Sequence, residues 1–319
     1  MSRRGWILLA SLGLIWGVPY LFIKIAVGQV SPATVVFART AIGALLLLPF
    51  ALRAGGLRPL SGHWPAVAAF AVLEIIGPWL FLSNAERTLS SSTTGLLVAT
   101  VPIAAVVIGR AVDRRPVAPV RWLGLLVGLG GVVVLLGPGA AAGEPWAVAQ
   151  VLLAALGYAI APMVADRYLA DVPSPSLTTA VLALSALVYL PVVAVTGWPT
   201  DLEADGVISL VVLGVVCTAL AFTLFFRLIA EVGPARSTLV AYLNPLVAVT
   251  AGALVLDEPV GWPLVVATAL ILLGSAAAAR RTTPSPSAPE EPGEVAGAER
   301  TPQLEDARAS RTQNGGMSG

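Results

Sequence analysis

The sequence is poor in charge, cysteine and histidine. Only 12% of its 319 residues are charged, whereas 57% are apolar; soluble domains carry about 25% charge. Cys217 and His63 are the one cysteine and the one histidine, so neither a disulfide framework nor a zinc or iron site of Cys and His ligands can form. The net charge of +1 gives no electrostatic footprint for nucleic acid. These shortages exclude a soluble enzyme, a disulfide scaffold and a nucleic-acid-binding protein, and they predict no metal and no cofactor.

Long apolar stretches follow one another through most of the chain. A membrane-crossing helix needs about 20 apolar residues, and continuous apolar runs favour helices over a β-barrel, whose strands alternate. We therefore predict an all-α integral membrane protein with ten transmembrane helices in a lipid bilayer. The expected spans are 5–26, 33–52, 64–84, 92–110, 120–138, 145–163, 176–196, 207–228, 236–256 and 261–279.

The basic residues are distributed unevenly between the two sets of connections. Loops on the cytoplasmic side of a membrane protein carry an excess of Lys and Arg. With the N-terminus inside, the outside segments carry only Lys24 and Arg87. The inside segments carry Arg3, Arg4, Arg53, Arg58, Arg110, Arg114, Arg115, Arg121, Arg167, Arg227, Arg236, Arg280 and Arg281. This bias predicts a multi-pass protein of the cell membrane with both termini cytoplasmic. The segment 280–319 is rich in Pro, Ser and Glu, which predicts a disordered cytoplasmic tail.

The second half of the chain repeats the first. With a shift of 143, residues 92–132 align without gaps to 235–275, and ten of these 41 positions are identical, including Pro102/Pro245 and Gly109/Gly252. Each repeat holds five spans, so the second copy enters the membrane from the opposite side. We expect two inverted five-helix repeats, 5–138 and 145–279, an arrangement that many secondary transporters use.

Several motifs resemble those of the drug/metabolite transporter superfamily of the EamA type. They are "LIWGVPYLFIKIA" in the first span, "SPATVVFARTAIGALLLLP" entering the second, and Gly-Pro-Ala, Asn-Pro and Asp-Glu-Pro around the ninth. The resemblance covers 5–279 and implies a ten-helix transporter of small metabolites that does not hydrolyse ATP. The family usually keeps an acidic residue after the fourth span, as Glu258 stands after the ninth, but here Arg115 takes that place.

The function that these features favour is secondary transport. We expect alternating-access export of a small metabolite, amino acid or drug, with uptake as the alternative because topology does not fix direction. A non-transporting membrane scaffold is a further alternative, although it would not need the inverted repeat. A membrane enzyme would need clustered ionisable groups, and only Arg39 and Glu74 lie at membrane depth. The chain also has no Gly-Lys-Ser/Thr phosphate loop.

Arg39 and Glu74 are the main candidates for coupling or gating. A charge inside the membrane costs several kcal/mol unless it is paired or hydrated, and the two residues stand at heights within roughly 6 Å of each other. They either form a structural ion pair, or Glu74 faces a cavity and binds a substrate amine or a coupling proton. Pro102 and Pro245, which the repeat matches, are either gating hinges or static kinks.

Polar and aromatic side chains inside the spans are candidates for substrate binding, because such groups suit a cavity for a small organic molecule. The alternative for each is packing against a neighbouring helix. Trp79 is expected to be an interface anchor instead, and Gly124, Gly128, Gly131 and Gly274 are expected to allow close helix packing. With Glu74, the substrate-binding candidates are Trp16, Tyr20, Asn84, Tyr158, Tyr242 and Asn244.

Overall fold

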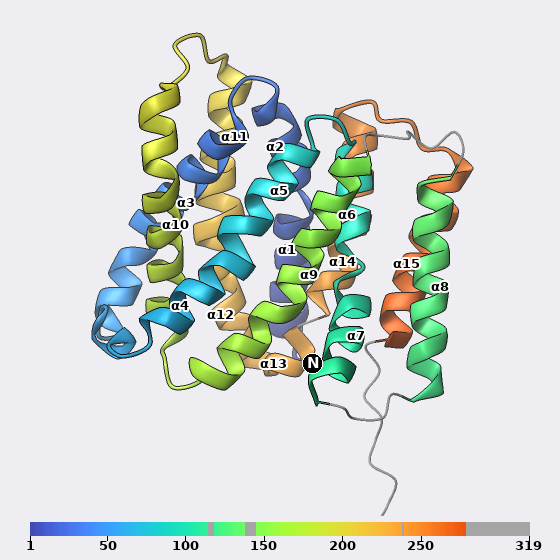
Figure 1. Cartoon of the computed structure of the whole chain (residues 1–319), viewed down its shortest axis with the longest axis horizontal. Coiled ribbons are helices and arrows are strands. Elements are labelled where there is room, and N and C mark those ends of the chain that lie inside the picture. The colour runs from blue at the N-terminus through green and yellow to red at the C-terminus, as the bar shows by residue number, and fades with distance from the viewer. Residues whose placement is uncertain (114–117, 138–144, 238, 279–319) are drawn as a thin grey trace, which may run out of the picture. The chain divides into compact units, whose positions relative to one another are not determined.

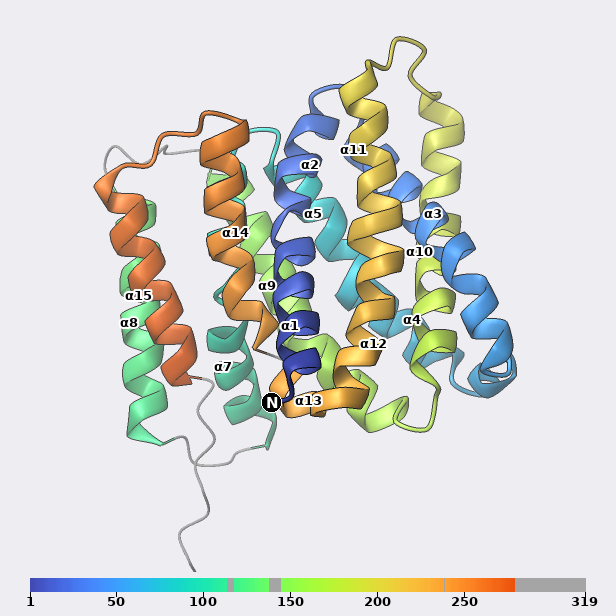
Figure 2. The ribbon, with the colours of Figure 1, turned by 180° about the vertical axis from the view of Figure 1, so that it is seen from behind.

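The protein folds as a bundle of helices. A computed structural model describes residues 1–113, 118–137, 145–237 and 239–278, and no strand occurs among them. The expected tail 280–319 and the loop with Arg114 and Arg115 lie outside these described residues. The elements (Figures 1 and 2) are α1 (Arg3–Gly17), α2 (Pro19–Val27), α3 (Pro32–Arg53), η1 (Arg58–Leu60), α4 (Trp64–Ala71), η2 (Val72–Ile76), α5 (Gly77–Ala85), α6 (Ser91–Val98), α7 (Val101–Asp113), α8 (Pro119–Leu135), α9 (Pro145–Tyr168), α10 (Ser174–Thr196), α11 (Ala204–Gly214), η3 (Val215–Leu220), α12 (Ala221–Val232), α13 (Pro234–Ser237), α14 (Val240–Val255) and α15 (Trp262–Ala278).

The all-helical prediction is confirmed, and the helices match the expected apolar stretches. Within the described residues, seven helical stretches are long and apolar enough to cross a membrane. They are 3–27, 32–53, 64–85, 91–112, 145–168, 174–196 and 204–232. Three shorter apolar helices, α8, α14 and α15, occupy the other three expected spans. Several stretches are broken where the sequence predicts continuity: α1 ends before Pro19, and α6 ends before Pro102.

Tryptophans mark both ends of the bundle. We call the end at which α1 begins the lower end and the opposite end the upper end, as they stand in Figure 1. Exposed tryptophans stand near the ends of helices at both levels, which is typical of anchors in the two membrane–water interfaces. Those at the lower end are Trp6, Trp64 and Trp122, and those at the upper end are Trp146, Trp198 and Trp262. Trp79 is buried at 7% exposure, so the expectation that it is an interface anchor is wrong.

Helix packing follows the repeat. Several of the larger contacts between two helices have a counterpart 143 residues along the chain. The helix α5 packs on α9 as α12 packs on α1, α4 packs on α10 as α11 packs on α3, and α7 packs on α9 as α14 packs on α1. The pairs α3/α10 and α8/α15 each join equivalent helices of the two halves. In Figure 1, α1 starts at the lower end whereas α9 starts at the upper end.

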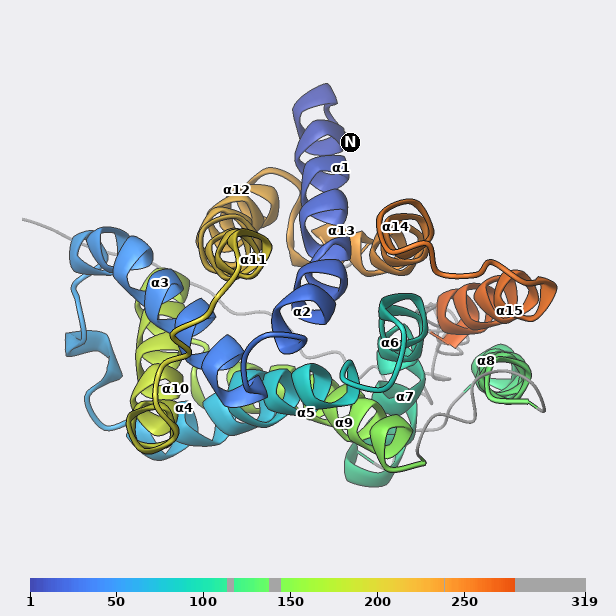
Figure 3. The same ribbon diagram turned by 90° about the horizontal axis from the view of Figure 1, so that it is seen from above.

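Glycines bring α8 and α15 together at one side of the bundle (Figure 3). A Cβ on Gly124 would lie 2.6 Å from the backbone nitrogen of Ala278, and one on Gly131 would lie 2.7 Å from the side chain of Ile271. A Cβ on Gly274 would overlap the backbone of Gly128. Contacts this close need residues without a side chain, so the expected packing role of these glycines is confirmed.

The two ends of the bundle are packed differently. At the upper end, α2 packs against α5, α6, α11 and α14. Toward the lower end, α1 packs with α12 and α14, whereas α9 packs with α4 and α7. Within the described residues, neither α1 nor α12 packs to a similar extent against α7 or α9. The group of α1, α12 and α14 and the group of α9, α4 and α7, each of which contains helices of both halves, are therefore joined more closely at the upper end, where α2 contacts α5, α6, α11 and α14.

Candidate binding site between the halves

Arg39 joins the two halves at the centre of the bundle. It lies on α3 and is only 7% exposed. Its Nε donates a hydrogen bond of 2.9 Å to Thr218 Oγ1 on η3. Its guanidinium carbon lies 3.6 Å from the centroid of the Trp79 ring on α5, a cation–π contact that is strongest where water is excluded. Thus Trp79 contributes to the interior, and Thr218 is a partner of Arg39 that no sequence pattern indicated.

The segment η3 presents Thr218 to Arg39 because its helical turn is wider than an α-helical one. Thr218 Oγ1 donates to the carbonyl of Leu213, five residues earlier, at 2.8 Å. A Cβ on Gly43 of α3 would lie 2.6 Å from the Thr218 methyl group, so the glycine provides the room for this contact. Such π-helical turns are rare and are often found at functional sites.

Glu74 lies on η2, the π-helical segment of the first half, and it is partly exposed. Within the described part of the chain its carboxylate has no hydrogen-bond partner, and Arg39 is not among its contacts. The ion pair considered as one alternative is therefore not formed. The heights of two residues in a bundle do not fix the directions in which their side chains point. A carboxylate that is partly exposed and unpaired at this depth is free to bind a ligand.

Two tyrosines surround η2. Tyr189 of α10 donates a hydrogen bond of 2.7 Å to the carbonyl of Ile76. Tyr158 of α9 is partly buried and packs against the core residues on both sides of η2. The charges of Glu74 and Arg39 both act on its phenol. The structure thus brings Arg39, Glu74 and Tyr158 into one region.

Trp16 and Tyr20 approach this region from the first span. Tyr20 is buried and packs beside Gly95 of α6, and the charge of Arg39 acts on its phenol. Trp16 packs against two rings of α12, with centroids 5.9 Å from Phe222 and 5.0 Å from Phe225. Its ring is partly exposed and lies at the contact between α1 and α12.

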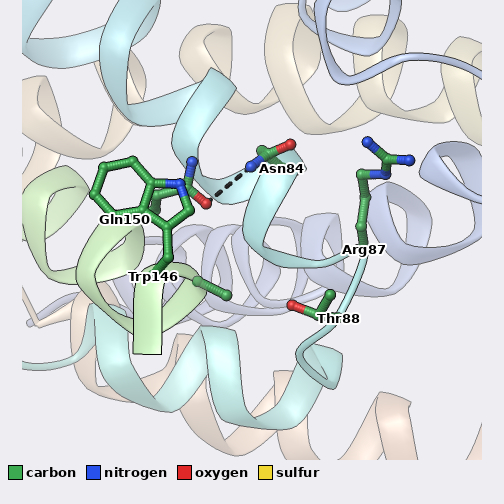
Figure 4. A pocket seen from close by; sticks show the side chains of 6 residues that line it. Asn84, Arg87, Thr88, Trp146 and Gln150 are labelled. Atoms are coloured by element: carbon green, nitrogen blue, oxygen red, sulfur yellow. Dashed lines mark hydrogen bonds between the residues drawn. The ribbon is translucent and has the colours of Figure 1, made fainter. Parts of the chain in front are cut away.

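Asn84 lies elsewhere, at the upper end of α5. It donates a hydrogen bond of 2.9 Å to Gln150 of α9, and it lines a pocket of about 400 Å³ (Figure 4) together with Arg87, Thr88, Trp146, Ala147 and Gln150. Ten helical residues separate Asn84 from Glu74, a rise of about 15 Å. The structure therefore does not bring Asn84 into the central region.

Tyr242 and Asn244 connect α14 to its neighbours. Tyr242 donates to the carbonyl of Ser275 on α15 at 3.5 Å. With its amide nitrogen turned toward the facing carbonyls, Asn244 donates to Gly13 of α1 at 3.3 Å and to Val240 at 3.0 Å. Both side chains thus use their polar groups for contacts between or along helices.

The two matched prolines occupy different positions. Pro102 is the second residue of α7, directly after the break that ends α6, whereas Pro245 lies inside α14. The break exposes the carbonyl of Ala99, which accepts a hydrogen bond of 2.6 Å from Ser275 Oγ. The break is therefore tied to α15 of the other half.

Glu258 has a role that the Asp-Glu-Pro motif alone did not reveal. Its carboxylate accepts hydrogen bonds from the amides of Ser91, at 2.7 Å, and Ser92, at 3.0 Å. It thus caps the N-terminus of α6, where a negative charge is favourable. A Cβ on Gly252 would collide with this carboxylate, which explains the glycine. Within the described residues, no three His, Cys, Asp or Glu side chains are grouped to hold a metal ion.

Comparison with known proteins agrees with this architecture. The pattern of the EamA-like transporter family matches residues 3–137 and again residues 145–279. The uncharacterized inner membrane transporter YedA of Escherichia coli is 27% identical over 248 residues, which cover 76% of this chain and 80% of YedA. The uncharacterized transporter YvbV of Bacillus subtilis is 28% identical over 281 residues, covering 85% and 90%. One crystal structure has the same fold, with a TM-score of 0.62 and 21% identity, over 87% of this chain and 97% of that one.

Proposed function

Because this chain belongs to the EamA-like transporter family, we propose that it is a secondary transporter. It exports a small metabolite, amino acid or drug across the cell membrane by alternating access. YedA and YvbV, two relatives that match most of its length, are named transporters rather than enzymes, which confirms the resemblance and supports a small-molecule substrate in a membrane setting.

The proposal includes ten crossings, arranged as two inverted five-helix repeats over 5–138 and 145–279. The exchange of packing partners under the shift of 143 supports this arrangement. If the two repeats adopt slightly different conformations, exchanging those conformations turns the molecule over, which opens it to the other side.

The single observation that carries the proposal is the pair of π-helical segments at the centre. The segments η2 and η3 begin at Val72 and Val215, which are 143 residues apart. One presents Glu74 and the other presents Thr218, and Arg39 is bound between the halves. Substrate sites of inverted-repeat transporters lie in this position, where non-regular helices expose polar groups near the midplane.

The substrate that best fits this region carries an amine. Glu74 is the acceptor in the proposed site, and Tyr158, Tyr20 and Trp16 supply aromatic walls. Arg39 already has two partners, so it holds Trp79 and η3 in position and acts in gating rather than binding an anion. Asn84 belongs to an outer binding step, and the segments that begin near Pro102 and Pro245 bend during the cycle. Tyr242 and Asn244 stay candidates for substrate binding, and the alternative for both is the packing role described above.

The lower end is proposed to be cytoplasmic, with both termini inside. Single cysteines at Ala204, at the upper end of α11, and at Ala170, in the turn after α9, test this in a Cys217→Ala background; both positions are exposed. An impermeant thiol reagent should label Ala204→Cys in intact cells and Ala170→Cys only after permeabilisation. The reverse pattern would overturn the orientation. With this orientation, the conformer described here is closer to an inward-open one.

A flux assay tests the function. Proteoliposomes should transport one or more amino acids or organic amines down their gradients, with and without a proton gradient. Protein-free liposomes and the Glu74→Gln variant are the controls. No flux above these controls for any cation or zwitterion would contradict the proposed substrate class, and no flux for any small molecule would contradict transport. Preparations with one uniform orientation would then decide between export and uptake.

A further inference from the structure

Glu86 is a buried carboxyl group that the central site does not use. It is the first residue after α5, at the upper end, on the turn that leads to α6. The residue is 0% exposed. Within the described residues, neither of its carboxylate oxygens has a hydrogen-bond partner. Buried polar groups are nearly always paired, so an unpaired carboxylate in this position requires an explanation.

Its neighbours do not supply a partner. The Lys24 ammonium of α2 donates instead to two backbone carbonyls, those of Glu86 at 2.7 Å and Leu89 at 2.8 Å. Arg39 of α3 is bound to Thr218. Glu258, from the loop between α14 and α15, adds a negative charge, and the Tyr20 phenol of α2 also senses the charge of Glu86. Two cations and one anion thus act on the carboxyl group, and none of them is a hydrogen-bond partner.

Burial is the strongest of these influences. It raises the pKa of Glu86 well above its usual value, and Glu258 raises it further, while Lys24 and Arg39 lower it. An ionised carboxylate without donors is costly in this position. The cost disappears if the group is protonated, or if the upper end opens and admits water.

We propose that Glu86 is a proton-binding site that holds the upper end closed when it is occupied, and that its ionisation favours opening. The proton is thereby the coupling ion, and this role rests on the proposed transport function. The location fits, because Glu86 lies beside the contact between Glu258 and α6. That contact joins the second half to the first at this end.

The direction of the pH dependence follows from linkage. The closed form binds the proton more tightly than the open form does, so acid favours the closed form. The open population rises with pH between the ordinary pKa of a glutamate, about 4.3, and the raised pKa of Glu86 in the closed form. A single proton changes this population by at most about tenfold per pH unit.

Ser91 provides a probe of the opening. Its side chain is 0% exposed and its hydroxyl has no partner, so Ser91→Cys is a nearly isosteric change in the closed form. Thr88→Cys, on the same turn but exposed, is the matched control for thiol chemistry. Both are made in a Cys217→Ala background and reconstituted in nanodiscs, where a thiol reagent reaches both ends.

The measurement is the modification rate of Ser91→Cys, divided by that of Thr88→Cys, between acid and mildly alkaline pH. The ratio should rise with pH when Glu86 is present. It should stay low and flat in Glu86→Gln, which mimics the protonated form. Glu86→Asp should keep a pH dependence. If Glu86→Gln keeps the full dependence, or if the ratio never changes in the wild type, the proposal is wrong.

If the Glu86→Gln protein does not fold, a second measurement on Glu86→Asp takes its place. In that case the ratio for Glu86→Asp must still rise with pH, with a shifted midpoint, and an unshifted curve overturns the proposal. Labelling requires no substrate, so it separates the two proposals. Labelling that responds to pH in a protein without any flux contradicts transport alone, whereas flux with labelling that ignores pH contradicts the proton site alone.

Discussion

The two π-helical segments, η2 and η3, have the same kind of backbone conformation but carry different side chains. The shift of 143 places Glu74 of η2 opposite Cys217 of η3. Glu74 is partly exposed and unpaired within the described residues, whereas Cys217 is fully buried in an apolar core. The next residue, Thr218, uses its hydroxyl group fully: the oxygen accepts a hydrogen bond from Arg39, and the hydroxyl donates one to the carbonyl of Leu213. One half therefore offers a free ligand group, and the other half has used its polar group internally.

This difference shows how a symmetric fold can hold an asymmetric substrate. The backbone geometry at the centre is repeated, which suits an exchange of conformations between the halves. The side chains are not repeated, so one substrate orientation can be favoured. Arg39 is the link between the two segments, since it comes from the first half and binds the second.

The largest expected effect comes from removing the charge at the free position. Glu74→Gln should lower amine transport roughly 10- to 100-fold, which corresponds to the loss of a hydrogen bond to a charged group. Cys217→Ala, the equivalent position in the second half, is the control and should leave flux near wild-type. Initial rates in proteoliposomes, with equal amounts of folded protein, test this. Equal losses in both variants would break the comparison.

The packing around η2 should also tolerate an added methyl group less well than the packing around η3 does. A Cβ on Gly157 would lie 2.5 Å from the carbonyl oxygen of Leu73, whereas the atoms nearest to one on Gly43 belong to side chains, those of Thr218 at 2.6 Å and Leu182 at 3.3 Å. A backbone atom gives way less easily, so Gly157→Ala should cost about 1–3 kcal/mol through overpacking. Its thermal midpoint in detergent should fall further than that of Gly43→Ala. The opposite ranking would show that η3 is the more rigid segment.

The hydrogen bond between Arg39 and Thr218 can be tested separately. Thr218→Val removes the hydroxyl group and leaves Arg39 Nε buried without its acceptor, at a cost of about 1–2 kcal/mol. Thr218→Ser keeps the hydroxyl group and should restore most of the lost thermal stability. If the two variants are equally destabilised, the methyl packing, rather than the hydrogen bond, is the stabilising contact.

The smallest effect should come from the ring under Arg39. Trp79→Phe keeps an aromatic face but weakens the cation–π contact, by about 0.5–1 kcal/mol. Trp16→Phe is the matched change of an interior tryptophan that packs on other rings instead of a cation. Raising the salt concentration should not alter the difference between them, because the Arg39 contact is buried. A thermal shift series reads this out, and a larger loss in Trp16→Phe would argue against the cation–π assignment.

Much of this fold follows from the sequence because apolar runs and prolines locate helices. All ten expected stretches contain a helix, and Pro19, which has no backbone N–H to donate to the preceding turn, explains the break at Val18. The π turns were not predicted, since one extra residue in a turn leaves the apolar pattern almost unchanged. The glycine contacts of α8 and α15 were predicted because small residues spaced along a membrane helix have few other uses.

The site was predicted less completely. Arg39 and Glu74 stand out because charge is rare at membrane depth. The direction in which each side chain points around its helix axis cannot be read from the height of the residue. The sequence therefore left the Arg39–Glu74 ion pair open as an alternative, and the structure does not form it. Glu86 was missed because a charge at the end of a span resembles a solvated loop residue. Only the packing of α2, α6 and the loop of Glu258 around it shows that it is buried.

One distance measurement tests alternating access most directly. Spin labels at Thr88 and Asp257 report on the upper end, and labels at Ala170 and Ala230 report on the lower end; all four positions are exposed. Double electron–electron resonance in liposomes, across pH and added amines, should give two populations at each end. The account predicts that whenever the population with the long upper distance grows, the population with the short lower distance grows by the same amount. Distances that change together, or an upper end that opens while the lower end stays fixed, would contradict it.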